Sequence, residues 1–186
     1  MAIASSSRVW TWEEALDLAD GDRYEVIDGE LKERIMSFRS SKIAILIAAM
    51  LVSWSRAGHP GTVTGSDGGY TIFPWAPGDV RMPDVSYISR SRLPKTPKRG
   101  WVDVPPEFAV EVISPTDIVS NAEDKAQDYI RAGVGLVWVV IPSTRSVHVW
   151  RADGSRSVVQ AGATLSGEDV LPGFTIEVDT LFAEDE

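Results

Sequence analysis

The chain has 186 residues, 44% of them hydrophobic, which suits one compact domain with a substantial core. It has no cysteine, which excludes disulfides, thiolate nucleophiles and cysteine-ligated metals, and its two histidines are too few for a multi-histidine metal site. The net charge of −9 argues, taken alone, against high-affinity nucleic-acid binding. No segment resembles a secretion signal, and the longest apolar stretch, 43–52, is shorter than a membrane span of roughly 20 residues. We therefore expect a soluble, cytoplasmic protein without a membrane contact.

Turn and cap signals define the elements of the first quarter of the chain. Thr11-Trp12-Glu13-Glu14 is a capping box that predicts a short helix ending near Ala19. Asp28-Gly29 predicts a tight hairpin between strands at 23–27 and 30–36. Residues 40–56 form a long apolar pattern that predicts a helix closed by Gly58.

The remaining elements are mostly strands. Asp67-Gly68-Gly69 predicts a hairpin between strands at 62–65 and 70–74, and a further strand is expected at 84–88. The apolar run 108–113 is typical of a central strand that is buried on both faces. After it we expect a helix that is opened by a Ser120–Glu123 capping box and ended by Gly133. A strand at 136–141 should follow, and then a hairpin in which 146–150 pairs with 157–160 around Asp153-Gly154. This order predicts a single α/β domain over 1–186, with a core at about 10–180, an N-terminal β-hairpin, a mixed central sheet flanked by helices, and an acidic C-terminal tail.

Two carboxylates and a lysine are the candidate chemical groups. Glu111 lies in the middle of an apolar strand, where an acid is costly to bury unless a cation pairs with it. Asp84 opens another strand, and if the two strands are neighbours, one register places both acids on one face. Lys125 is spaced three and four residues from Ala122 and Tyr129, which belong to the expected inward face of its helix.

Such a group would suit a divalent cation. Mg²⁺ or Mn²⁺ prefers oxygen ligands, which two carboxylates, a backbone carbonyl, waters and a substrate phosphate can supply. The cation would activate water, while a lysine would orient or deprotonate that water or stabilise the developing charge. The pattern therefore favours hydrolysis of a phosphodiester.

Three segments of the chain form a pattern together, namely 24–30 (YEVIDGE), 81–87 (RMPDVSY) and 110–115 (VEVISP), followed by Lys125, Tyr129, Gly133 and the strand at 137–140. This pattern resembles the Uma-type (Uma-two) family of bacterial proteins, described as putative restriction endonucleases of the PD-(D/E)XK nuclease superfamily. The similarity extends from about residue 10 to 180.

The resemblance implies a restriction-endonuclease-like core and a Mg²⁺ site formed by Asp84, Glu111 and the Val112 carbonyl. It adds Glu25 as an upstream acid, although Glu25 could instead be a cross-strand partner of Lys32 or Arg34. The superfamily lysine is expected at position 113, which is Ile here, and the Uma-type pattern supplies Lys125 instead. Many relatives carry a histidine where this chain has serines and Arg39, at 37–41.

A basic loop completes the candidate site, formed by Arg90, Arg92, Lys95, Lys98 and Arg99. It is either a solvated loop or an arm that contacts the DNA backbone. The leading hypothesis is a Mg²⁺-dependent endonuclease acting on DNA. The alternatives are a nuclease-fold protein with weakened catalysis that binds nucleic acid or protein, and a hydrolase of another phosphoester. Many nucleases of this fold act as homodimers, which exposed apolar helix faces would permit here.

Overall fold

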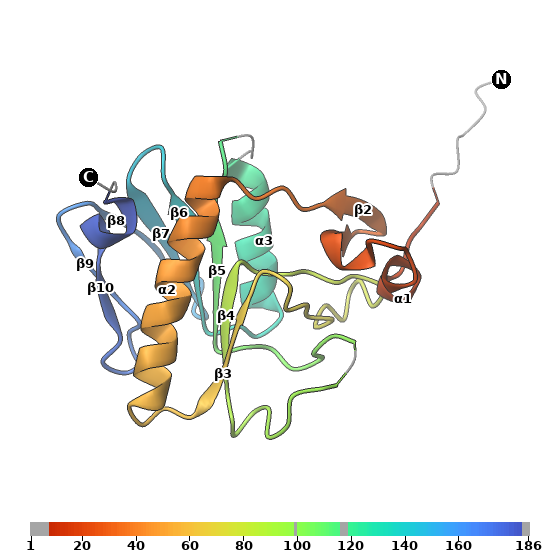
Figure 1. The fold of residues 1–186 in the computed structure, drawn as a ribbon, viewed down its shortest axis with the longest axis horizontal. Coiled ribbons are helices and arrows are strands. Elements are labelled where there is room, and N and C mark those ends of the chain that lie inside the picture. The colour runs from red at the N-terminus through yellow and green to blue at the C-terminus, as the bar shows by residue number, and fades with distance from the viewer. Residues whose placement is uncertain (1–7, 99, 116–118, 184–186) are drawn as a thin grey trace.

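The computed structural model describes residues 8–98, 100–115 and 119–183. Its centre is a six-stranded mixed sheet in the order β3-β4-β5-β6-β7-β8. A separate hairpin, β1-β2, lies at one side of this sheet in Figure 1, and a small C-terminal pair, β9-β10, lies at the other. The expected α/β fold with a mixed central sheet and an N-terminal hairpin is confirmed.

The N-terminal elements follow their turn and cap signals. Helix α1 (Trp12–Leu16) opens with the complete Thr11–Glu14 capping box and ends before Ala19, and a short 3₁₀ helix, η1 (Gly21–Arg23), follows. Strands β1 (Tyr24–Ile27) and β2 (Glu30–Glu33) pair antiparallel. Asp28 and Gly29 between them both have positive φ, of 52° and 76°, as a tight two-residue hairpin turn requires.

The central sheet joins segments that are distant in sequence. Strand β3 (Gly61–Gly65) pairs antiparallel with β4 (Val85–Ser89), and β4 pairs antiparallel with β5 (Phe108–Val112). The pairing of β5 with β6 (Leu136–Ile141) is parallel. Strands β7 (Ser146–Arg151) and β8 (Arg156–Gln160) complete the sheet as the expected hairpin.

Two helices cover opposite faces of the sheet. Helix α2 (Phe38–Arg56) packs Ile43, Ile47 and Leu51 against the face that carries Val110 and Val112. By length and composition alone, α2 is long and apolar enough to cross a bilayer, but core helices of soluble proteins can have the same length and composition. A third of its most apolar stretch is buried in the fold. Its packing on the sheet is therefore the role that the fold assigns to it.

Helix α3, described over Val119–Arg131, packs Ala122, Ala126 and Tyr129 on the other face, which carries Ala109 and Ile113. The side chains of β5 thus alternate between two cores, and Glu111 belongs to the face covered by α3. This placement brings an acid in the sheet and a lysine on the helix to the same side.

The C-terminal segment closes the α2 face of the sheet. Strands β9 (Thr164–Ser166) and β10 (Thr175–Glu177) pair antiparallel, and α4 (Val178–Phe182) follows directly. Leu165, Ile176 and Phe182 join the core beneath α2.

Two expectations about local structure were wrong. Residues 70–74 do not form a hairpin with β3, because the partner of β3 is β4, while Tyr70 makes single bridges to Arg81 and Val102. The buried strand β4 offers β3 a longer apolar partner than the loop that follows Gly69. Ser120 does not cap α3, since Val119 before it is already helical.

Candidate active site

Asp84 and Glu111 meet where β4 begins and β5 ends. The antiparallel register sets Val85 opposite Val110, and one step further along the same register sets Asp84 opposite Glu111. Both side chains are buried. The expectation that neighbouring strands would place the two acids together agrees with this register.

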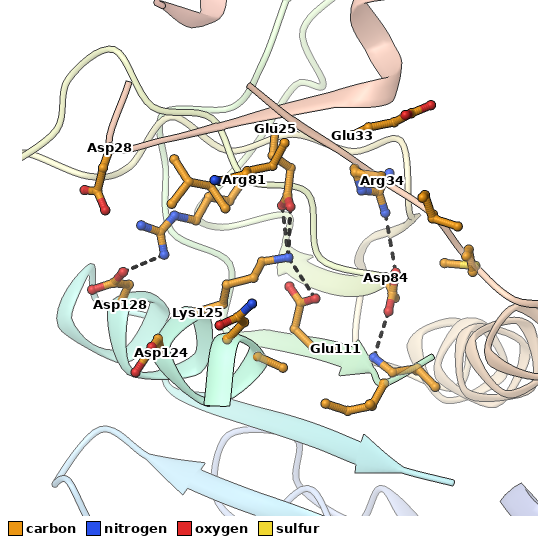
Figure 2. A pocket seen from close by; sticks show the side chains of 18 residues that line it. Glu25, Asp28, Glu33, Arg34, Arg81, Asp84, Glu111, Asp124, Lys125 and Asp128 are labelled. Atoms are coloured by element: carbon orange, nitrogen blue, oxygen red, sulfur yellow. Dashed lines mark hydrogen bonds and ion pairs between the residues drawn. The ribbon is translucent and has the colours of Figure 1, made fainter. Parts of the chain in front are cut away.

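The carboxylate of Glu111 is held by two groups from α3. Lys125 Nζ donates to Glu111 Oε2 at 2.9 Å, and Tyr129 Oη donates to Oε1 at 3.1 Å. Lys125 and Tyr129 are four residues apart, so they project from the same side of the helix. Figure 2 shows Lys125 reaching from α3 toward the sheet.

Glu25 approaches the same ammonium group from the N-terminal hairpin. Lys125 Nζ lies 3.1 Å from the Glu25 carboxylate, whose Oε1 also accepts a 2.7 Å hydrogen bond from the backbone N–H of Met82. In the hairpin register Lys32 is opposite Glu25, but the ammonium group of Lys32 pairs with Glu30. Glu25 is therefore a partner of Lys125, not of a residue on its own hairpin.

Asp84 has different partners from Glu111. Its Oδ2 accepts a 2.7 Å hydrogen bond from the backbone N–H of Val112, and its Oδ1 lies 3.4 Å from a terminal nitrogen of Arg34. The first contact fixes Asp84 against the end of β5. The second is at the outer limit of hydrogen-bond length and is correspondingly weak.

Burial governs the protonation of these groups. It raises the pKa of Glu111 to about 7, although the Lys125 ammonium opposes this shift, and it also raises the pKa of Asp84 against the opposing Val112 N–H. Burial alone would lower the pKa of Lys125, but the carboxylates of Glu111 and Glu25 outweigh it and the pKa is raised. Burial and the same two carboxylates hold the pKa of Tyr129 well above its ordinary value, so its phenol stays protonated and can donate.

A cleft of about 560 Å³ lies between the hairpin, the sheet and α3, and it is lined by Glu25, Asp84, Glu111 and Lys125 among others. Seven carboxylates and four cationic side chains line it, and the cations are Lys32, Arg34, Arg81 and Lys125. The cleft is therefore net acidic, a character that suits a cation better than an unassisted phosphate.

The donor set fits a hard divalent cation. Asp84 and Glu111 are buried acids that stand opposite each other at the end of β5, where Val112 also lines the cleft. Within the described ranges 8–98, 100–115 and 119–183, no three His, Cys, Asp or Glu side chains form a group that could hold a metal ion. Mg²⁺ usually takes one or two protein carboxylates and completes its shell with waters and substrate phosphate, so two acids and a carbonyl are compatible with it.

The basic loop does not line the cleft. Arg90, Arg92, Lys95 and Lys98 follow the end of β4, whereas Asp84 precedes its start, and five strand residues span about 16 Å. Arg92 contacts the Pro105 carbonyl and Glu107 at this far end. Arg99 lies outside the described residues, and a contact between this loop and DNA stays a prediction.

Three contributors to the site were missed from the sequence. Tyr129 holds Glu111, and its spacing of four from Lys125 could have indicated this role. Arg34 and Arg81 line the cleft from segments outside the strands and helices, where no periodicity reports the direction of a side chain. Near the position of the histidine found in relatives, the buried Ser40 donates a 3.3 Å hydrogen bond to the Ile113 carbonyl, which fastens the start of α2 to the end of β5.

Comparison with known proteins agrees with this architecture. The profile of the Uma2 family, described as "Putative restriction endonuclease", matches residues 12–179. A crystal structure of "a putative nuclease belonging to DUF820" from Anabaena variabilis ATCC 29413 superposes with a TM-score of 0.78 at 18% identity, covering 92% of this chain and 97% of that one. No curated protein matches the chain.

The fold is thus that of a nuclease-like α/β protein, with buried acids and a lysine gathered in one cleft. Because the profile covers most of its length, the chain belongs to the Uma2 family of putative restriction endonucleases.

Proposed function

We propose that the protein is a divalent-cation-dependent endonuclease that hydrolyses phosphodiester bonds of DNA. The observation that carries the proposal is the Lys125 ammonium group, about 3 Å from two buried carboxylates that come from the hairpin and from β5. Asp84 stands opposite Glu111 across the same strand ends. An arrangement of three acids and a charged lysine in one cleft suits the cleavage of a phosphate ester.

Each residue has a part in this proposal. Asp84, Glu111 and the Val112 carbonyl would hold Mg²⁺ or Mn²⁺, which would supply a Lewis acid for the phosphate and a more acidic water. Lys125, with its raised pKa, remains protonated, so it acts by stabilising developing negative charge and not as a base. Glu25 and Tyr129 hold Lys125 and Glu111 in position.

The second candidate is a nuclease-fold protein with weakened catalysis that binds nucleic acid or protein. The observation in its favour is that Lys125 Nζ is already paired with both Glu111 and Glu25, so a divalent cation has to compete with an ammonium group. The two candidates differ in whether the acids are needed for turnover or only for the stability of the fold.

The test combines metal titration with cleavage. Mn²⁺ is titrated calorimetrically into the wild type, Asp84→Asn and Glu111→Gln, with Asp103→Asn, an exposed acid on a loop, as the matched control. We expect saturable binding in the wild type and the control, and its loss in both site variants. Cleavage of supercoiled plasmid should fall roughly 100-fold or more in the site variants.

Absence of Mn²⁺ binding by the wild type at millimolar concentration would contradict the endonuclease. Binding without cleavage of duplex or single-stranded DNA would favour the second candidate.

A further inference from the structure

Arg34 is a cation inside the cleft that the proposed reaction does not yet use. It follows β2, and its side chain is only 16% exposed. Its backbone N–H is fixed by the Arg23 carbonyl at 3.0 Å. The residue is therefore held in the cleft by its main chain as well as by its burial.

The guanidinium group is firmly anchored at one of its two terminal nitrogens. One terminal nitrogen donates to the Ser66 carbonyl and lies 3.9 Å from Met82 Sδ and 3.9 Å from the carboxylate of Asp67, which is exposed and therefore a weak partner. The other terminal nitrogen makes the 3.4 Å contact with Asp84 Oδ1. An arginine that is oriented by a carbonyl but weakly bonded to its carboxylate can bind another anion without unfolding its own surroundings.

Two of the three other cations of the cleft are more firmly engaged than Arg34. Lys125 is bonded to two carboxylates at about 3 Å, and Arg81 donates to Asp128 at 2.6 Å. Lys32 is largely exposed and pairs with Glu30. Arg34 is therefore the cation beside Asp84 that is most available to a phosphate, and a planar guanidinium matches two phosphate oxygens.

We propose that Arg34 is a phosphate-binding residue. When substrate binds, its guanidinium group leaves Asp84, which becomes free for the divalent cation, and binds the non-bridging oxygens of the phosphodiester. The inference rests on the proposed function, because it requires a phosphodiester in this cleft. A purely structural ion pair would instead only tie Asp84 to the Ser66 loop. The two roles predict opposite changes in the affinity for metal.

The experiment measures metal and DNA binding separately in Arg34→Met and Arg34→Lys. Arg23→Met is the control, since Arg23 is an exposed arginine that pairs with Glu33 at the base of the same hairpin. Mn²⁺ affinity is measured by calorimetry. Binding of a fluorescent duplex is measured by anisotropy with Ca²⁺ as the cation, over a series of salt concentrations.

We expect Arg34→Met to weaken duplex binding roughly 10-fold, the effect of losing a charge-assisted hydrogen bond. The slope of log affinity against log salt should fall by about one, as for one lost phosphate contact. Mn²⁺ should bind a few-fold more tightly, because Asp84 loses a competing cation. Arg34→Lys should recover part of the duplex affinity, and the control should match the wild type.

Unchanged duplex affinity and salt slope in Arg34→Met would overturn the inference. Weaker Mn²⁺ binding in that variant would overturn it as well, because the arginine would then be supporting Asp84. A wild type that binds neither Mn²⁺ nor duplex contradicts the proposed function itself, and is thereby distinguished from a failure of Arg34 alone.

Discussion

Among the residues of the site, Glu111 is one whose charged form is strongly disfavoured by burial. It is a carboxylate near the end of the central strand β5, enclosed by α3 and by the Lys125 and Tyr129 groups that bond to it. Its pKa of about 7 means that deprotonation is resisted by burial more than it is favoured by Lys125. A metal ion would favour the charged form and so reduce this cost.

This pKa predicts a pH-dependent stability. An unfolded glutamate releases its proton near pH 4.5, whereas folded Glu111 retains it to about pH 7, so its contribution to the free energy of unfolding falls as the pH rises through that window. We expect the wild type to lose up to about 3 kcal/mol of unfolding free energy relative to Glu111→Gln between pH 4.5 and pH 8. Urea denaturation in EDTA measures it.

The matched control is Glu13→Gln, which alters an exposed glutamate of α1. Its difference from the wild type should change by less than that of Glu111→Gln over the same pH range. An equally small change for Glu111→Gln would mean that Glu111 ionises as an ordinary surface acid.

Single residues in regular elements were predictable from the sequence, and residues in loops were not. Strand alternation placed Glu111 on the face of Ala109, and helical spacing turned Lys125 inward, as the structure confirms. Arg34 follows its strand in an irregular segment, so its direction depends on the Ser66 carbonyl, a contact 32 residues away. A contact between residues so far apart cannot be predicted from the residues next to Arg34.

At the scale of elements, the β1-β2 hairpin is fastened over the cleft at its turn. The buried carboxylate of Asp79 accepts hydrogen bonds from the N–H groups of Asp28 and Gly29, at 2.9 and 3.3 Å. Arg81 lies 3.8 Å from Asp79 and donates to Asp128 on α3 at 2.6 Å. Since Glu25 is on this hairpin and Lys125 is on α3, the connection fixes their relative position.

Removing the connecting arginine should be costly. Arg81→Met would leave Asp79 buried without its cation, and we expect the free energy of unfolding to fall by about 3–5 kcal/mol. The control Arg90→Met changes an exposed arginine of the basic loop and should stay within about 0.5 kcal/mol of the wild type. Urea denaturation measures both, and a loss below 1 kcal/mol for Arg81→Met would show that Arg81 is not needed to hold the hairpin in place.

Elements with strong local signals were predicted well, and the pairing of strands was predicted less well. The Asp28-Gly29 turn and the Thr11 capping box act within a few residues, and both are present. The partner of β3 depends on which buried strand is available across about 20 residues of intervening chain, so the turn signal at 67–69 was misleading. Tertiary packing decided this pairing.

At the scale of the whole molecule, negative charge dominates. The chain carries a net charge of −9, and acids outnumber cations in the cleft as well. A DNA backbone approaching this surface is repelled unless cations compensate. The protein should therefore bind DNA only together with a divalent ion. That it forms a homodimer also stays a prediction.

Duplex binding measured by anisotropy should be undetectable in EDTA and should appear on addition of millimolar Ca²⁺. Sodium chloride at matched ionic strength is the control, and it should not substitute for Ca²⁺, since monovalent ions only screen charge. Equal binding in EDTA and in Ca²⁺ would place the DNA on another surface, such as the basic loop at the far end of β4.

The bond between Glu25 and Lys125 closes a span of 100 residues. Contacts between such distant segments form late, because the intervening chain has to be ordered first. During synthesis Glu25 leaves the ribosome long before Lys125 exists, and Tyr129 is later still. The cleft is therefore assembled only when about two thirds of the chain has been made, so a nascent chain carries Glu25, Asp84 and Glu111 before the lysine that pairs with two of them.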